Sequence, residues 1–236
     1  RVRESGQYGG AIRGMVPAGT APAMRRRHTL PSDPADAPGP CGPPPRAMSN
    51  TPQPHALTAH PRTPCAAVQG LRVAVAAAPD GWWLRYALAA DLVALRLPAA
   101  RTAPGPADGL WRHTCLEAFV GSAEGAAYLE FNFSPSGDWA AYAFRAPRER
   151  AGAGPLAFTP RLRWSRSMDA LTLDAWLPRA IESALPQPPH LLGLSAVIEP
   201  ADGPPSYWAL AHPAARPDFH QRAAWTARLP ALDPRR

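Results

Sequence analysis

The stretch YLEFNFSPSGDWAAYAFR, residues 128–145, places ligand-binding side chains at the two-residue period of a strand. Glu130, Asn132 and Ser134 alternate with Phe131 and Phe133. A strand here therefore has one polar face and one apolar face. Carboxylate and amide groups on one face can bind hydroxyl groups in a fork geometry. The polar face is the first candidate for a binding surface.

A hairpin turn follows this strand. The residues SPSG, 134–137, fit a type I turn, with Pro at the second position and Gly at the fourth. A four-residue loop places Asn132 opposite Trp139 and Glu130 opposite Ala141. Arg145 joins Trp139 by parity, because residues 139, 141, 143 and 145 share one face. We predict that Trp139 is a stacking platform on the polar face, with Arg145 at its margin.

A second segment, GLWRHTCLEAFV at residues 109–120, carries a glutamate between apolar side chains. Both faces of this strand are apolar, so we expect it at mid-sheet with Glu117 buried and hydrogen-bonded. Glu117 either has a structural partner, such as an Arg or a Tyr hydroxyl, or lines a recessed pocket with Glu130 and Asn132. Trp111 and His113, just before this strand, belong to the margin of the same site.

An indole beside amide, carboxylate and guanidinium groups is typical of sugar binding, because the ring covers the C–H face while the polar groups bind hydroxyls. The two carboxylates Glu117 and Glu130 also suggest glycoside hydrolysis as an alternative function. That reaction needs two carboxylates at a defined separation. The structural alternative is a cross-strand ion pair between Arg145 and Glu130 that Trp139 covers. We expect binding rather than catalysis, and assign no catalytic residue.

Histidines and cysteines give no metal pattern. The loop-like HPAARPDFH, which contains His212 and His220, matches no standard zinc spacing, and structural roles are favoured for the histidines. Haem ligation by His113 would need a second His or a Met such as Met168. The three cysteines, an odd number without a CxxC motif, favour neither a disulfide framework nor a zinc cluster.

Short apolar or alternating runs, separated by Pro, Gly and Asp, extend from about residue 68 to the end. They predict an all-β fold, an antiparallel β-sandwich of about 9–11 strands with at most one short helix at 179–185. The strand candidates are residues 71–77, 82–89, 92–98, 110–120, 127–133, 139–145, 158–165, 171–178, 191–199, 206–212 and 224–230.

Residues 1–60 are rich in Pro and small polar residues and have no apolar periodicity, so we expect a disordered extension before a domain at 61–232. Met48 is a plausible start of translation. Residues 1–47 hold seven arginines and three carboxylates, so +4 of the formal charge of +7 lies there. The remaining +3 is ordinary for a domain surface and does not favour a nucleic-acid partner.

No apolar run reaches the length of about 18 residues that a membrane span needs. No charged segment followed by an apolar stretch and a cleavage site indicates secretion. From the sequence we therefore expect a cytoplasmic protein without a membrane partner.

The segments GLWRHTCLEAFV, YLEFNFSPSGDWAAYAFR, GLSAVIE, SYWALAHP and PDFH together resemble the DOMON-like family, in particular its bacterial branch related to family 9 carbohydrate-binding modules. The resemblance covers about residues 55–230, and EFNFSPSGDWAAY is its most specific part. It implies a β-sandwich that binds a ligand, which is a sugar in some branches and haem in others. It implies ligand contacts at Trp111, His113, Glu117, Glu130, Asn132 and Trp139.

The residues and the resemblance together predict a non-catalytic module that binds a saccharide or a sugar-like metabolite, without a metal or cofactor. Two alternatives stay open. One is a haem-binding redox module, and the other is a protein-interaction domain that takes no small ligand.

Overall fold

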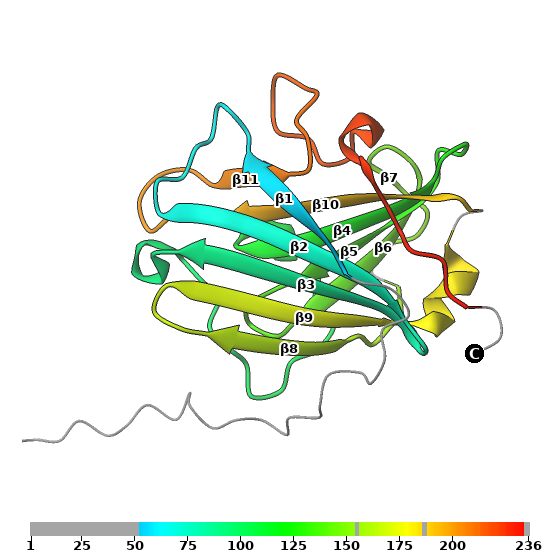
Figure 1. Ribbon diagram of the computed structural model, residues 1–236, viewed down its shortest axis with the longest axis horizontal. Coiled ribbons are helices and arrows are strands. Elements are labelled where there is room, and N and C mark those ends of the chain that lie inside the picture. Colours follow the sequence, from blue (N-terminus) through cyan, green and yellow to red (C-terminus); the bar gives the residue numbers. More distant parts are fainter. Residues whose placement is uncertain (1–51, 154–155, 186–187, 234–236) are drawn as a thin grey trace, which may run out of the picture. The chain divides into compact units, whose positions relative to one another are not determined.

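The computed structural model describes residues 52–153, 156–185 and 188–233, and it is built almost entirely of strands (Figure 1). Four short 3-10 helices accompany the strands in this part of the chain: η2 (Leu92–Ala94), η3 (Leu110–Arg112), η4 (Arg179–Ala184) and η5 (Arg222–Ala224). The twelve strands are β1 (Gln53–Ala59), β2 (Val68–Ala78), β3 (Gly81–Ala90), β4 (Cys115–Ser122), β5 (Tyr128–Phe133), β6 (Trp139–Ala146), β7 (Glu149–Arg150), β8 (Arg161–Arg166), β9 (Ala170–Pro178), β10 (His190–Ile198), β11 (Ser206–Ala209) and β12 (Ala227–Arg228).

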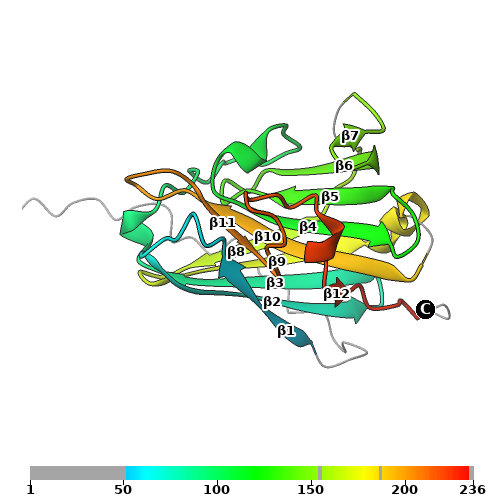
Figure 2. The ribbon, with the colours of Figure 1, turned by 90° about the horizontal axis from the view of Figure 1, so that it is seen from above.

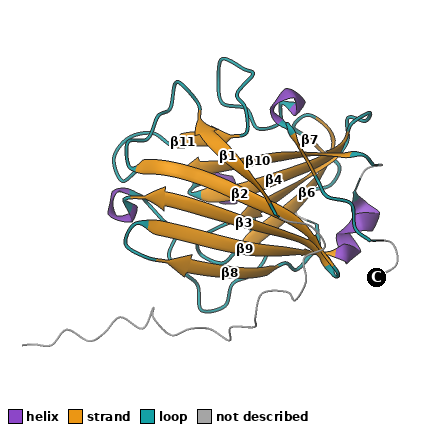
Figure 3. Ribbon diagram, viewed as in Figure 1, coloured by secondary structure: helices purple, strands orange, loops and turns teal. Residues whose placement is uncertain are grey.

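The strands form one continuous antiparallel sheet in the order β7-β6-β5-β4-β10-β11-β1-β2-β3-β9-β8, with β12 beside β10. The sheet folds over at β1, which pairs with β2 through residues 53–57 and with β11 through residues 58–59. Figure 2 shows the resulting two layers, with β2, β3, β9 and β8 facing β4, β5, β6 and β10. Figure 3 shows how little of the chain is helical. The predicted all-β antiparallel fold is confirmed, with twelve strands where about 9–11 were expected.

The core lies between the two layers and follows the two-residue period of the strands. On β3, for example, Leu84, Tyr86 and Leu88 are buried, whereas Arg85 and Ala87 between them are exposed. Tyr86 also links the layers, because its buried hydroxyl donates to the backbone carbonyl of Glu117 at 2.7 Å. This hydrogen bond fixes β4 over β3.

Strands β4 and β5 are buried on both faces, as predicted for the segment that carries Glu117. Their core face presents Leu116, Ala118 and Phe131 to the opposite layer. Their outer face presents Glu117 and Glu130, which therefore must be covered by something other than the second sheet. Loops supply that cover, and the space between the loops and this face is the site described below.

The β5–β6 hairpin corrects the prediction for Trp139. Phe133, not Asn132, lies opposite Trp139, and the Ser134 N–H donates to the Asp138 carbonyl at 2.9 Å. The loop between them therefore has three residues rather than four, and it ends at Gly137 in the left-handed region with φ of +92°. The odd length places Trp139 on the core side, where its Nε1 donates to the Phe158 carbonyl at 2.8 Å.

Arg145 lies where the β6–β7 register shifts, between Phe144 and Ala146, so parity does not fix its direction. It is exposed and forms an ion pair with Glu149. The structural alternative, an ion pair of Arg145 with Glu130 covered by Trp139, is therefore wrong as well. The predicted loop length was wrong because hydrogen bonds within the loop favour three residues. The Ser136 hydroxyl, for example, donates to Asp138 Oδ2 at 2.9 Å. These short bonds stabilise the tighter turn.

Replacing Trp139 with alanine should therefore lower stability. The indole is half-buried against the core, so we expect a loss of about 3 kcal/mol in the free energy of unfolding, near the lower end for truncated aromatics. Urea denaturation followed by tryptophan fluorescence measures it. A variant as stable as the parent would show that this ring is not part of the core.

Two further predictions need correction. The sheet begins at Gln53 instead of after residue 60. Leu57 of β1 is buried, and β1 pairs with both layers. Pro54 and His55 interrupt the apolar pattern of this strand, so the sequence did not indicate it. The prediction of disorder for residues 1–51 lies outside the described residues. Residues 92–98 form η2 and a loop rather than a strand, because the Asp91 side chain accepts from Val93 N–H and caps a helical turn. Within the described ranges, no helix is long and apolar enough to cross a membrane.

Candidate functional site

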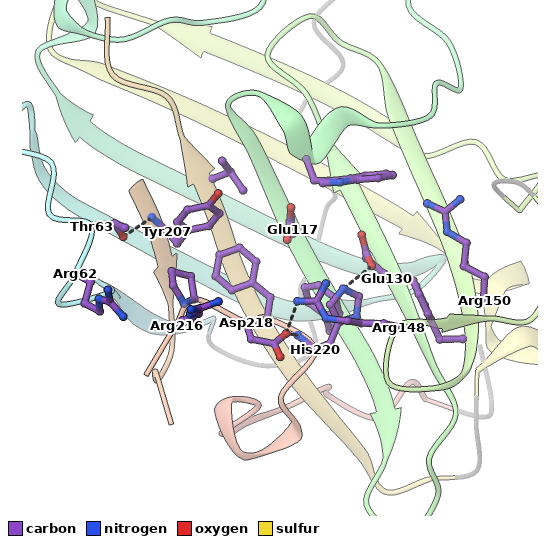
Figure 4. Close-up of a pocket in the computed structure, with 16 residues that line it drawn as sticks. Arg62, Thr63, Glu117, Glu130, Arg148, Arg150, Tyr207, Arg216, Asp218 and His220 are labelled. Atoms are coloured by element: carbon purple, nitrogen blue, oxygen red, sulfur yellow. Dashed lines mark hydrogen bonds and ion pairs between the residues drawn. The ribbon is translucent and has the colours of Figure 1, made fainter. Parts of the chain in front are cut away.

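A pocket of about 760 Å³ lies on the outer face of β4 and β5, and both buried glutamates face it (Figure 4). Its rim is built by segments far apart in the sequence: the loop after β1, helix η3, the β6–β7 hairpin, β11 and residues 216–220. Glu117 and Glu130 lie in the middle of the close-up view, with Arg62 and Arg216 toward one end and Arg150 toward the other. The volume falls in the range of roughly 300–1,000 Å³ typical of small-molecule sites.

Of the seven residues predicted for the site, the structure brings Trp111, Glu117 and Glu130 to the pocket. Asn132 lies fully buried beside Glu130 and acts as its hydrogen-bond donor. His113 does not line the pocket. Its side chain is 64% exposed and its Nδ1 lies 3.0 Å from Glu199 Oε2. Trp139 packs on the core side of the sheet, and Arg145 pairs with Glu149 and does not line the pocket.

Glu117 is the deepest polar group of the pocket, with 2% of its surface exposed. Its Oε2 accepts a hydrogen bond from the Ser195 hydroxyl of the neighbouring strand β10 at 3.2 Å. Burial raises the pKa of this carboxyl well above its ordinary value, and the nearby charge of Glu130 raises it further. This carboxyl therefore keeps its proton to a higher pH than an ordinary glutamate does, and in its protonated form it can donate a hydrogen bond into the pocket.

Glu130 lies on the adjacent strand and is 5% exposed. Its Oε1 accepts from Asn132 Nδ2 at 2.7 Å, which fixes the orientation of the carboxyl. Burial raises the pKa of Glu130 to about 7, although the Asn132 hydrogen bond and the charges of Arg150 and Arg148 act in the opposite direction. At neutral pH this group can either donate or accept a proton in hydrogen bonds with a ligand.

His220 approaches Glu130 from the loop before η5, with 3.9 Å between its Nε2 and Glu130 Oε2. The other ring nitrogen, Nδ1, lies 2.6 Å from the hydroxyl of Tyr128, and that hydroxyl accepts from the Arg148 backbone N–H at 3.1 Å. We infer that Tyr128 donates to Nδ1, so the neutral ring carries its proton on Nε2, toward Glu130. Burial, helped by Arg148, lowers the pKa of His220 to about 4.

Arg148 holds this corner of the pocket in place. It is the non-glycine residue with a left-handed backbone in the described chain, with φ of 62°, a conformation that costs free energy. The Tyr128 hydroxyl binds its N–H, and Asp218 Oδ1 binds its Nη2 at 2.8 Å. Asp218 also accepts from the His220 backbone N–H at 3.1 Å. The strained hairpin and the His220 loop are therefore tied together at one carboxylate.

Trp225 packs against the same two rings as His220, those of Phe119 and Tyr128. Its ring stacks against Phe119, with 5.7 Å between centroids, and its Nε1 donates to the Phe219 carbonyl at 2.9 Å. Gly121 and Gly193 make room for the ring on the sheet, because a Cβ at Gly193 would lie 2.3 Å from Trp225 Cδ1. The glycines on β4 and β10 thus let the C-terminal segment lie close to the sheet and carry His220 to the pocket.

Residues considered for metal or haem binding do not come together. Met168 is 90% exposed in the β8–β9 turn, and His113 is bound to Glu199 outside the pocket. No group of three or more His, Cys, Asp or Glu side chains in the described ranges could hold a metal ion. The side chains present in the pocket do not fit a haem with axial His and Met ligands.

Most of the side chains at the rim of the pocket were not predicted from the sequence. Arg62, Thr63, Arg148, Arg150, Tyr207, Arg216, Asp218 and His220 all line the pocket. Most of them lie in loops, where no periodicity indicates which way a side chain faces. One signal was present: in the segment HPAARPDFH, Arg216, Asp218 and His220 alternate around Pro217, and two prolines restrict the backbone. A restricted loop with polar side chains is a candidate binding loop.

Comparison with known proteins places the fold but not a family. No protein-family model matches the chain, and no curated protein matches it. The structure of a Bacteroides uniformis protein, described as a candidate carbohydrate-binding protein, superposes with a TM-score of 0.56 over 78% of this chain and 86% of that chain. The two chains share a fold. Their sequences are 15% identical, so the similarity extends to the architecture and no further.

Proposed function

We propose that this protein is a non-catalytic module that binds a carbohydrate or a sugar-like metabolite in the pocket on the outer face of β4 and β5. One observation carries the proposal: two buried carboxyl groups, Glu117 and Glu130, face the same cavity as the indole of Trp111. Oriented groups that can donate or accept suit hydroxyls, and an aromatic ring suits the apolar face of a sugar.

In this proposal Trp111 takes the role first assigned to Trp139. It lies on η3 and packs edge-to-face on Tyr142, with 5.6 Å between ring centroids. The guanidinium of Arg150 lies 5.3 Å from the centroid of the Trp111 ring and 4.1 Å from that of Tyr142. These contacts fix the indole at the rim before a ligand arrives. A pre-ordered ring costs little entropy on binding.

The shared fold with the Bacteroides uniformis protein also supports carbohydrate binding, since that protein is described as a candidate carbohydrate-binding protein. The resemblance to DOMON-like domains adds to it. Neither names the ligand, so the ligand must come from the chemistry of the pocket.

A thermal-shift screen with neutral sugars, sugar acids and sugar phosphates tests the proposal. A saccharide at 100 times its Kd should stabilise the protein by about 2.7 kcal/mol, which is visible as a rise in Tm. Mass spectrometry after incubation should return the saccharide intact. Absence of any shift across the panel would contradict the proposal, and conversion of the saccharide would make the protein an enzyme.

A further inference from the structure

Four arginines line the pocket, and they differ in what they contact. Arg148 pairs with Asp218 at 2.8 Å, and Arg150 lies 3.5 Å from Asp108. Arg62 has a backbone partner instead: its Nη1 donates to the Ala215 carbonyl at 3.4 Å. Arg216 forms no hydrogen bond or ion pair with any described residue. Two guanidinium groups at the pocket therefore have no carboxylate partner in the described part of the chain.

These two arginines lie next to each other. Figure 4 places Arg62 and Arg216 at the same end of the pocket, with Thr63 and Tyr207 beside them. The bond from Arg62 to the carbonyl of residue 215 brings its guanidinium to the backbone that carries Arg216. Two adjacent cations repel each other, so this end of the pocket favours an anion between them.

A buried histidine holds the two loops in this arrangement. His60 is 3% exposed, and its Nδ1 accepts from the Arg62 backbone N–H at 3.2 Å. The proton of its neutral ring therefore lies on Nε2, which donates to the Ala214 carbonyl at 3.2 Å. The His60 backbone N–H also donates to the Tyr207 carbonyl at 2.7 Å. His60 thus connects the Arg62 loop with the Arg216 loop and holds the backbones that carry the two arginines together.

The other pocket carboxyls do not compensate this charge. Asp218 is engaged by Arg148 and by the His220 backbone N–H. Burial and the charge of Glu130 favour the protonated form of Glu117, and Figure 4 places this carboxyl in the middle of the pocket rather than beside the two arginines. The Thr63 hydroxyl accepts from the Tyr207 backbone N–H at 3.3 Å and can donate its own hydrogen to an anion at the Arg62 end. The pocket is therefore cationic at one end and hydroxyl-binding in the middle.

Resting on the proposed function, we propose that the saccharide carries an anionic group, a carboxylate or a phosphate, which Arg62 and Arg216 bind while Glu117 and Glu130 bind its hydroxyls. Guanidinium groups bind both anions through charge-assisted, often bidentate hydrogen bonds. Burial favours the protonated form of both Glu117 and Glu130, so these carboxyls oppose an anionic ligand less than two ordinary carboxylates would.

Calorimetric titration with matched probes tests this. Glucuronate and galacturonate are compared with their neutral amides, and glucose 6-phosphate and galactose 6-phosphate with the free sugars. An anionic probe should bind at least about 10-fold more tightly than its neutral match. The double variant Arg62→Ala/Arg216→Ala should weaken that probe about 100-fold and remove its advantage. Arg145→Ala, at an exposed arginine that does not line the pocket, should change nothing.

The outcomes separate the two proposals. A preference for the uronates or for the phosphates identifies the anion, and either supports the inference. Neutral probes that bind as tightly as their anionic matches would overturn it and leave the proposed function standing. Inorganic phosphate that binds as tightly as the sugar phosphates would also overturn it, because the sugar would contribute nothing. If no probe of either kind binds, both proposals fall.

Discussion

Replacing Trp225 with alanine is expected to cost about 3–5 kcal/mol in the free energy of unfolding, the range for truncated buried aromatics. The ring is 3% exposed, and its centroid lies 5.1 Å from that of Tyr128. The variant also loses the hydrogen bond to the Phe219 carbonyl, which fixes the segment before η5. Because that segment carries His220, ligand binding should weaken together with stability.

Chemical denaturation monitored by circular dichroism measures the loss, and calorimetric titration measures the binding. Trp176→Ala is the matched control, a half-buried tryptophan on the outer face of the other layer. It should leave binding unchanged. If Trp225→Ala were as stable as the parent, this ring would not anchor the C-terminal segment, and some other contact would have to hold His220 at the pocket.

A large effect of pH on stability is expected at Glu130, and the variant Glu130→Gln tests it. The pKa of Glu130 is about 7 in the folded protein, above the value of about 4.3 for an unfolded chain. Between these values the folded state binds more protons than the unfolded state, so the parent loses stability as pH rises through the window. Glutamine keeps the acceptor for Asn132 Nδ2 and cannot ionise.

The variant should therefore gain about 3 kcal/mol relative to the parent between pH 4.5 and pH 8. Removing the Glu130 charge also eases ionisation of Glu117, which acts in the same direction. Denaturation midpoints at several pH values check this, with the exposed Glu124→Gln as the control. A stability difference that does not change with pH would contradict the buried position of Glu130.

The contribution of His220 to stability has the opposite pH dependence, so the Glu130 effect is read from the difference between the variant and the parent. Its pKa is lowered to about 4 in the fold, below the value of about 6.5 for a free histidine. Unfolding therefore takes up a proton between pH 4 and pH 6.5, and this contribution to stability increases with pH. In the parent the two groups oppose each other across most of the window. In Glu130→Gln only Glu117 opposes the histidine contribution, so stability should fall less steeply with pH than in the parent.

The strands and the polar face were predictable because both depend on a local period. Alternation along residues 128–133 places Glu130 and Asn132 on one side of β5, and the apolar flanks of Glu117 place its strand at mid-sheet. Both predictions concern residues close in sequence, and the pleat of a strand fixes the faces on which such residues lie. Glu117 and Glu130, two of the seven predicted site residues, line the pocket for that reason.

The register and the rim were not predictable in the same way. Whether Trp139 faces the core or the pocket depends on one residue of loop length, which hydrogen bonds of Ser136 and Asp138 decide. Arg62 and Arg216 lie 154 positions apart, and they meet because His60 bonds to both loops. No period within either loop carries that information, since it depends on the folded arrangement of β1 and β11.

The most direct test of the central claim compares two tryptophans in one titration. Trp111 lines the pocket and Trp139 packs against the core, so the two alanine variants should separate binding from stability. With the tightest saccharide from the screen, Trp111→Ala should raise Kd by about 10- to 100-fold, by analogy with aromatic stacking on nucleic-acid bases, and leave Tm nearly unchanged. Trp139→Ala should lower Tm and leave Kd as it is. A Trp111→Ala variant that binds like the parent, with Trp139→Ala losing the ligand, would contradict the account.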